Sequence, residues 1–169
     1  MWNGLFVAAF ICSFALPQEV QAENLQIPGG EPVLTVSGEI GVINVGDEAV
    51  FDLAMLQELS STEITTTTIW TDGLQVFEGV LLHDLLGALD VEMGTIRATA
   101  INDYAVEIPF EDAVEGGPIV AYLRNGAPMM VRDKGPLWII YPYDSKPEYN
   151  SEEIYSRSIW QLDRIEIVH

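Results

Sequence analysis

The residues that could carry chemistry in this chain are few, and the most unusual group is a run of four threonines. Thr65–Thr68 stand in the stretch EITTTTIWTDG, which ends at Gly73. A threonine hydroxyl is neutral and hard, whereas a cysteine thiolate is soft and anionic, so the run cannot supply a sulfur ligand to a transition metal. The single cysteine, Cys12, lies in an apolar N-terminal run. Residues 23–169 therefore have no disulfide, thiolate ligand or cysteine nucleophile.

Cations are also scarce, and two of them fall together in the stretch RDKG. Arg132, Lys134 and Gly135 could hold a small anion, because glycine permits close approach of a backbone. The alternative is an exposed turn in which Asp133 offsets part of the positive charge. The sequence contains no phosphate loop, EF-hand spacing or dinucleotide fingerprint.

The overall charge excludes two classes of partner. Seven Lys and Arg stand against 26 Asp and Glu, a formal net charge of −19. Such a surface repels phosphate backbones and anionic headgroups, so we expect neither nucleic-acid binding nor direct binding to a membrane surface.

The N-terminus is typical of an export signal. An apolar run over residues 5–16 is too short to span a bilayer, and Val20-Gln21-Ala22 supplies the small residues of a cleavage site. We expect residues 1–22 to be a Sec-type signal peptide and the protein to be periplasmic; an uncleaved N-terminal anchor is the alternative. A short linker over residues 23–32 then leads into a single domain over residues 33–169.

Strand-like runs dominate that domain and are separated by short helical segments. Because β-branched residues are stiff at χ1, the threonine run favours a strand. We expect a turn at Asp72-Gly73, a helix over residues 80–89, a helical turn over 110–114 after Pro109, and a polar, tyrosine-rich loop over 141–157. This pattern predicts an α+β, mostly β fold. Further strands are expected at 33–36, 49–53, 76–81, 95–101, 104–108, 119–123, 137–143 and 159–168, with a short helix at 53–59.

Four segments resemble the molybdopterin-binding domain of the sulfite oxidase family. They are FEGVLLHDLLGAL from Phe77, YAVEIPFEDAVEGGPIVAYLRNGAPM from Tyr104, KGPLWIIYPY from Lys134 and SRSIWQLDRIEI from Ser156. The resemblance runs from about Gly30 to Ile167. It implies a sulfite oxidase-type fold with mixed sheets and short helices, and a molybdopterin-dependent oxidoreductase activity.

The resemblance also implies a site, and this chain departs from it. The family's molybdenum-binding cysteine would fall near Thr67, close to Trp70. Trp138 and Trp160 stand where relatives commonly carry Arg and Lys, whereas Arg157 matches a basic position that relatives usually keep. An indole carries no charge and cannot neutralise a phosphate.

We therefore expect a domain that has lost redox catalysis, holds no cofactor and binds a small-molecule ligand or a periplasmic or membrane protein partner. The candidate ligand pocket comprises Thr67, Trp70, Arg132, Lys134, Trp138, Arg157 and Trp160; alternatively, the two substituted tryptophans only fill space that a cofactor vacated.

The tyrosine-rich loop would be either a rim for a ligand or partner, or a disordered acidic loop. The alternative function is a molybdopterin oxidoreductase subunit without a cysteine ligand, but export of a loaded enzyme normally needs a twin-arginine signal, and residues 1–22 contain no arginine. A sensor subunit that docks on a membrane signalling protein is a third reading.

Overall fold

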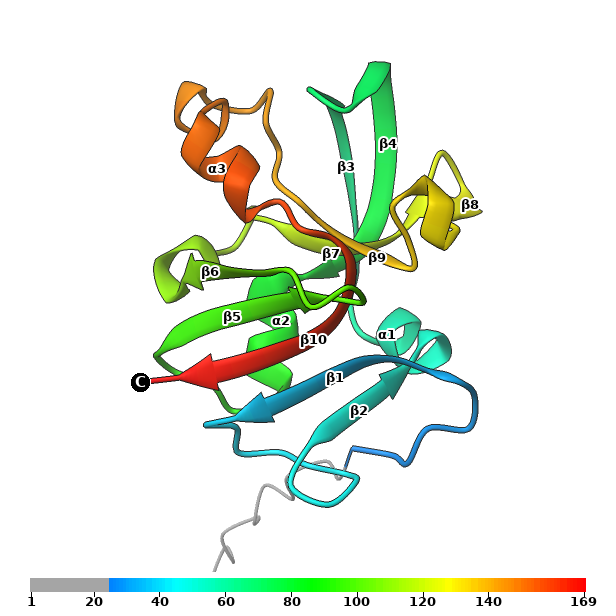
Figure 1. Ribbon diagram of the computed structural model, residues 1–169, viewed down its shortest axis with the longest axis vertical. Coiled ribbons are helices and arrows are strands. Elements are labelled where there is room, and N and C mark those ends of the chain that lie inside the picture. Colours follow the sequence, from blue (N-terminus) through cyan, green and yellow to red (C-terminus); the bar gives the residue numbers. More distant parts are fainter. Residues whose placement is uncertain (1–24) are drawn as a thin grey trace, which may run out of the picture.

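The computed structural model describes residues 25–169, so the expected signal peptide and Cys12 lie outside the described residues. The described chain forms a ten-stranded mixed sheet, in which seven strands follow the order β2-β1-β10-β9-β7-β4-β3 (Figure 1). The other three lie off this path: β5 pairs with β10 and β6, and β8 pairs with β7. β1 pairs with β10 in parallel, and the remaining pairs are antiparallel. The strands are β1 (Pro32–Gly38), β2 (Ala49–Asp52), β3 (Ser61–Thr68), β4 (Thr71–Leu81), β5 (Thr95–Ala100), β6 (Ala105–Pro109), β7 (Ile119–Arg124), β8 (Ala127–Pro128), β9 (Leu137–Ile140) and β10 (Trp160–Val168).

The helices in the described chain are short. Asp52 caps the first of them, since its carboxylate accepts a hydrogen bond from the N–H of Met55 (2.9 Å). The same carboxylate accepts the N–H groups of Gly29 and Gly30 (2.9 and 2.7 Å), which fastens the segment before β1 to the domain. The helices are α1 (Leu53–Glu58), α2 (Leu82–Ala88), α3 (Glu152–Arg157) and the 3-10 turns η1 (Phe110–Asp112), η2 (Val131–Asp133) and η3 (Pro147–Tyr149).

The hydrophobic core lies on the concave side of the curled sheet, where α2 packs (Figure 1). Leu82, Leu85 and Leu86 recur at helical spacing and are buried, so one face of α2 is covered. All four residues of β9 are also buried, as expected for a strand in the middle of a sheet. Apolar burial of this kind is the main driving force for the fold.

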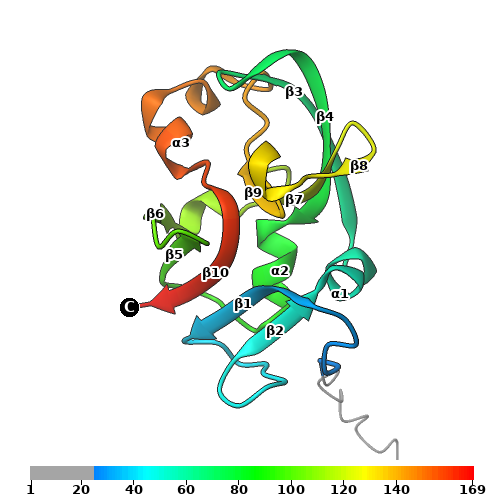
Figure 2. The same cartoon turned by 45° about the vertical axis from the view of Figure 1, so that its right-hand side comes forward.

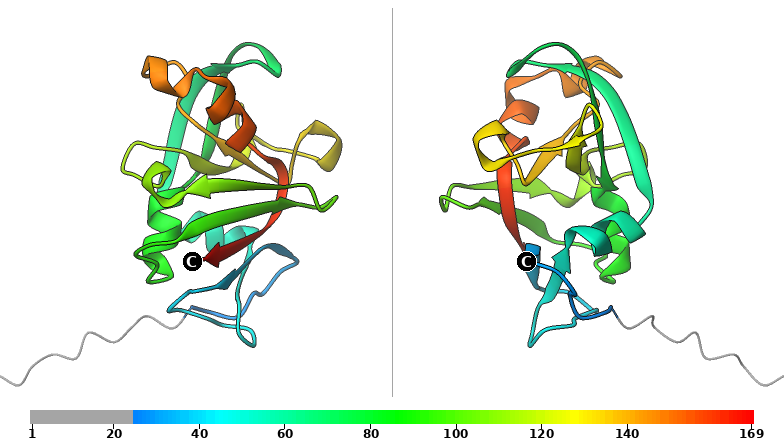
Figure 3. Two further views of the ribbon diagram at one scale, coloured as in Figure 1. Left: turned by 60° about the vertical axis from the view of Figure 1, so that its left-hand side comes forward. Right: turned by 90° about the vertical axis from the view of Figure 1, so that its right-hand side faces the viewer.

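The long β3–β4 hairpin arches away from the rest of the sheet and approaches the segment that leads into α3 (Figures 2 and 3). Hydrogen bonds fix this approach: the carboxylate of Asp144 accepts the N–H and the hydroxyl of Thr67 (2.6 and 2.8 Å). The N–H of Asp144 in turn donates to the hydroxyl of Thr66 (3.2 Å). The threonine run is therefore a strand, as predicted, and its hydroxyls bind the neighbouring loop.

Several local predictions are wrong. The hairpin reverses at Ile69-Trp70 and not at Asp72-Gly73, because the Thr68 hydroxyl accepts the N–H of Trp70 (3.1 Å) and closes an earlier turn. Strand β4 continues through Leu81, so the helix predicted at 80–89 begins only at Leu82. The helical turn after Pro109 is a 3-10 turn that ends at Asp112.

The polar, tyrosine-rich loop predicted at 141–157 contains η3 and α3. Ser151 caps α3 by accepting the N–H of Ile154 (3.4 Å), with Glu152 and Glu153 in the first turn and Arg157 in the last. These charges match the helix dipole. The N-cap serine and the charge order are a sequence signal that could have identified this helix.

Candidate functional site

A cluster of aromatic side chains occupies the space between the β3–β4 hairpin, β9, β10 and α3. Trp70, at the turn of the hairpin, lies at its centre. Its ring centroid is 5.7 Å from those of Trp138, Tyr155 and Trp160 and 6.3 Å from that of Tyr143, in edge-to-face geometry. Such pairs stabilise by about 0.5–1.5 kcal/mol each beyond the area they bury. We call these five residues the aromatic cluster.

The three tryptophans that the sequence suggested are thus brought together. Trp138 is fully buried, and its indole N–H donates to the carbonyl oxygen of Ser158 (3.2 Å). Trp160 remains 37% exposed and lies opposite Trp138 in the pairing of β10 with β9. Trp138 therefore works as a core residue, whereas Trp160 has surface left for a ligand.

Lys134 joins this group through its charge. Its ammonium lies 4.2 Å from the ring centroid of Trp160 and 5.6 Å from that of Trp138, which is cation–π geometry. No ion pair of Lys134 occurs within residues 25–169. The ammonium adds positive potential at one side of the cluster.

A small pocket of about 270 Å³ adjoins the cluster, and we call it the aromatic pocket. Tyr104 from the β5–β6 connection, Tyr155 from α3 and Trp160 from β10 contribute its aromatic wall. Its polar lining includes Asn102, whose side-chain oxygen accepts the N–H of Tyr104 (3.2 Å). This bond leaves the amide NH₂ of Asn102 as a donor for a ligand. Tyr104 is 58% exposed, so the pocket opens to solvent.

Thr67 points away from the interior. Its side chain is exposed, whereas Thr66 beside it is 1% exposed, as expected from the alternation of a strand. The backbone and hydroxyl hydrogen bonds from Thr67 lower the pKa of Asp144 below its ordinary value. Thr67 therefore acts as a donor to Asp144 from the exposed face of β3.

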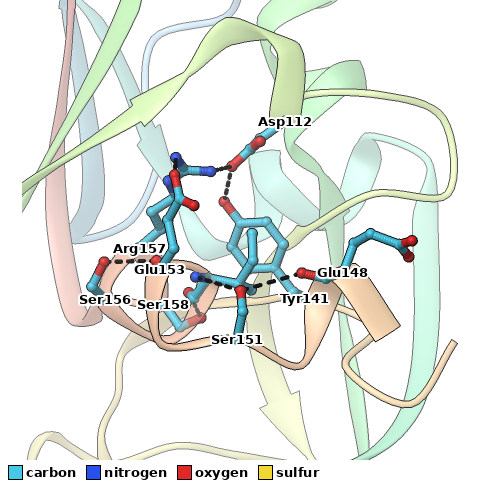
Figure 4. Close-up of polar contacts among 9 residues, drawn as sticks. Asp112, Tyr141, Glu148, Ser151, Glu153, Ser156, Arg157 and Ser158 are labelled. Atoms are coloured by element: carbon cyan, nitrogen blue, oxygen red, sulfur yellow. Dashed lines mark hydrogen bonds and ion pairs between the residues drawn. The ribbon is translucent and has the colours of Figure 1, made fainter. Parts of the chain in front are cut away.

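Arg157 is held by carboxylates on two sides (Figure 4). Its guanidinium donates to Asp112 (2.9 Å) and to Glu153, one turn earlier in α3. The same Asp112 oxygen accepts the hydroxyl of Tyr141 (2.7 Å). Burial, with the Asp112 carboxylate beside it, raises the pKa of Tyr141 far above its usual value. Arg157 thus fastens α3 to the core, and its charge is offset.

Arg132 and Gly135 lie apart from this arrangement. Arg132 is 78% exposed in its side chain and pairs with the neighbouring Asp133 (3.4 Å). At Gly135, an added Cβ would lie 1.9 Å from the carbonyl oxygen of Met129. The missing side chain of Gly135 therefore makes room for the backbone of Met129 and not for an anion.

Two general features complete the description of residues 25–169. They contain no group of three or more His, Cys, Asp or Glu side chains arranged to hold a metal ion. Within the same range no helix has the length and apolarity to cross a bilayer.

The sequence did not indicate Tyr104 as part of a site, whereas Tyr143 and Tyr155 belong to the tyrosine-rich loop that it suggested as a rim. Tyr104 and Trp160 meet only because β5 and β10 are paired, which brings the β5–β6 connection beside the start of β10. The tyrosine-rich loop was noted as a possible rim, and the placement of Tyr143 and Tyr155 gives that interpretation a structural basis.

Comparison with known proteins identifies the fold. Neither a protein-family model nor a curated protein matches this chain. Among solved structures, the sulfane dehydrogenase SoxCD from Paracoccus pantotrophus is similar, with a TM-score of 0.58 and 15% identity. The match covers 80% of this chain and 37% of that one, so this chain spans little more than a third of its structural relative. The predicted α+β, mostly β fold of the sulfite oxidase type is confirmed.

Proposed function

We propose that this protein is an exported binding domain of the sulfite oxidase-type fold that lacks molybdenum-dependent redox catalysis and binds a small ligand in the aromatic pocket. The observation that carries the proposal is the packing of Trp70, Trp138 and Trp160 against one another, in which Trp160 also lines a half-open pocket. In this proposal the buried Trp138 supports the cluster, and the partly exposed Trp160 contacts the ligand.

The residues present do not suit a molybdopterin cofactor. Cys12 is the only cysteine, and the four threonines of β3 offer only neutral hydroxyls in place of a thiolate. Arg157, the basic position that is kept, already pairs with Asp112 and Glu153. Binding a phosphate there would require the guanidinium to leave partners that are already charged and hydrogen-bonded.

The pocket favours a small planar ligand with a hydrogen-bond acceptor. Tyr104, Tyr155 and Trp160 offer ring surfaces for stacking, and the amide NH₂ of Asn102 offers donors. A volume of about 270 Å³ is just below the usual range for ligand pockets, which suits a molecule of one or two rings.

Benzamide is a suitable probe, since it has one aromatic ring and one acceptor carbonyl, and cyclohexanecarboxamide is its saturated control. A fragment of this size should bind with a dissociation constant on the order of millimolar. We expect benzamide to change the fluorescence of the tryptophans and the saturated control to bind at least severalfold more weakly. Tyr104→Ala should weaken benzamide binding about three- to tenfold because a stacking partner is lost. Met93→Ala, at an equally exposed apolar side chain outside the pocket, is the matched control and should leave binding unchanged.

The alternative is a molybdopterin-dependent oxidoreductase subunit in which no cysteine binds the metal, and its support is the fold alone. Metal analysis and pterin fluorescence of the protein purified from its own host separate the two proposals. Stoichiometric molybdenum with a pterin signal would refute the binding-domain proposal. Equal affinity for benzamide and its saturated control would refute the aromatic pocket as the ligand site.

Mass spectrometry of the same sample tests export, because cleavage after Ala22 removes residues 1–22. We also propose that the exported protein is periplasmic and that it can bind a protein partner in the periplasm or membrane. An acidic surface would make such an association depend on salt concentration.

A further inference from the structure

The last strand of the sheet has an uncovered edge. β3 ends the strand order and pairs only with β4 in the described chain. Figures 1 and 3 show the hairpin standing away from the body of the sheet, with β3 along one side of it. Strand edges of this kind present unpaired N–H and C=O groups to which an extended chain can add.

The register shows which backbone groups point outward. Val76 lies opposite Thr65, and both its N–H and its C=O bind Asn125 on the other side of β4 (2.9 and 2.7 Å). Residues directly opposite in an antiparallel pair either exchange both hydrogen bonds or face away from each other. The backbone groups of Thr65 therefore point away from β4, and by the two-residue period those of Glu63 and Ser61 do as well.

One outward group further along supports this assignment. The N–H of Thr67 also leaves the hairpin, and the carboxylate of Asp144 accepts it. Among residues 25–169, no hydrogen-bond partner accepts the N–H of Glu63 or Thr65. Asp144 thus terminates the open edge at Thr67, and the edge from Ser61 to Thr65 stays available.

The charge beside this edge is negative. Glu63 lies directly opposite Glu78 in a pair whose backbone groups face away from each other, the arrangement that brings opposing side chains closest. Neither carboxylate takes part in an ion pair within the described residues. Like charges in this position destabilise a sheet, and a cation between them would relieve the repulsion.

We propose that the edge of β3 from Ser61 to Thr65 is a docking site for an extended segment of a partner protein that carries Lys or Arg at alternate positions. Main-chain hydrogen bonds to the outward groups would give affinity, and the Glu63–Glu78 pair would select for positive charge. A second copy of this chain is a poorer occupant, because it would bring another Glu63 and a molecule of the same −19 charge to the edge. The site is separate from the aromatic pocket and does not depend on it.

The test uses the purified protein and a capped heptapeptide of alternating threonine and lysine, with a threonine–glutamate heptapeptide as control. Amide hydrogen exchange followed by NMR reports directly on Glu63 and Thr65. Both amides should exchange fast in the free protein. At a lysine-peptide concentration of twice its dissociation constant, their exchange should slow about threefold, in line with the bound fraction. The glutamate peptide should cause no such change.

Variants at Thr65 test docking through the backbone, and variants at Glu63 test the contribution of charge. Thr65→Pro removes the outward N–H at a position where an edge strand tolerates proline, whereas Thr65→Val keeps it. We expect the lysine peptide to bind Thr65→Val like the wild type and to lose detectable binding to Thr65→Pro. Glu63→Gln should weaken binding about two- to fivefold at low salt, and the difference should vanish at 1 M salt. Circular dichroism checks the fold of each variant, and Glu63→Lys offers a second, backbone-neutral test in which binding should also be lost.

Four results would overturn the proposal. Slow exchange at Glu63 and Thr65 in the free protein would show that the edge is already covered. Equal binding of the two peptides would remove the charge argument, and equal binding to Thr65→Pro and Thr65→Val would remove the backbone argument. A dimer in light scattering that Thr65→Pro converts to a monomer would assign the edge to a second copy.

Discussion

The hydrogen bonds around Asp112 predict how strongly α3 is fastened to the domain. One oxygen of Asp112 accepts both the guanidinium of Arg157 (2.9 Å) and the hydroxyl of Tyr141 (2.7 Å) (Figure 4). The side chains of Asp112 and Arg157 are each only 16% exposed. Glu153, the second partner of Arg157, is 71% exposed. Replacing Asp112 by alanine should therefore cost far more stability than replacing Glu153.

The magnitude follows from the groups that lose their partner. A buried hydroxyl left without a hydrogen bond costs about 1–3 kcal/mol, and Tyr141 is fully buried. Loss of one partner from a buried ion pair costs about 3–5 kcal/mol, and residual exposure of Arg157 together with Glu153 reduces this. We expect about 3 kcal/mol for Asp112→Ala. An exposed pair one helical turn apart contributes about 0.3–0.5 kcal/mol, which is the expected cost of Glu153→Ala.

Urea unfolding followed by tryptophan fluorescence measures both values. A cost of 3 kcal/mol corresponds to a melting temperature lower by roughly 6–12 °C in a domain of this size. In the double variant with Tyr141→Phe, the unpaired hydroxyl is gone, so about 1 kcal/mol should return. Because α3 carries Tyr155, Asp112→Ala should also weaken benzamide binding, and Glu153→Ala should not. A cost below 1 kcal/mol for Asp112→Ala, or one no larger than that of Glu153→Ala, would refute the reasoning.

Three further predictions concern pH and packing. Backbone N–H donors lower the pKa of Asp52, so the stability that its carboxylate contributes is complete above about pH 4 and is lost as the pH falls through the lowered pKa. The difference in urea midpoint between wild type and Asp52→Asn should therefore be largest at pH 7 and shrink toward pH 2. Burial raises the pKa of Tyr141 and Tyr143, so the stability that these neutral phenols contribute is complete below about pH 10 and is lost at higher pH. Absorbance at 295 nm should show the two phenols ionising only as the protein unfolds. Trp138→Ala should cost about 3–5 kcal/mol in urea unfolding, because it empties fully buried space, whereas Trp160→Ala, at a 37% exposed side chain, should cost clearly less.

The sequence was informative where local chemistry decides the structure. The β-branched threonines predicted β3, and four segments of the sequence predicted the sulfite oxidase-type fold. The turn of the hairpin was misplaced because Asp72-Gly73 is a strong turn signal in isolation. Gly73 does adopt a positive φ of 68°, but within β4, where the register with β3 shifts. Tertiary packing of Trp70 and the Thr68 hydroxyl set the turn three residues earlier.

The candidate site was only partly accessible to sequence reasoning. Trp138 and Trp160 were identified because they replace cations that the resemblance leads one to expect, yet nothing in their spacing distinguishes a buried indole from one that lines a pocket. That distinction arises from the sheet: β9 lies between β7 and β10 and is covered on both faces, whereas β10 starts beside an open connection at Tyr104. Composition also could not show that Arg157 is occupied, since its partners Asp112 and Glu153 are ordinary acidic residues in a chain rich in them.

Arg157 and the tryptophans Trp138 and Trp160, at positions where the resemblance implies basic residues, are physically connected. An unpaired arginine at the edge of the core would carry a desolvation cost, and Asp112 offsets that cost. Arg157 is then free to fasten α3, and α3 in turn places Tyr155 against Trp70 and beside Trp160. Arg157 thus supports an aromatic wall while its own charge is offset, and for this reason we expect the aromatic pocket to prefer an uncharged, planar ligand to an anionic one.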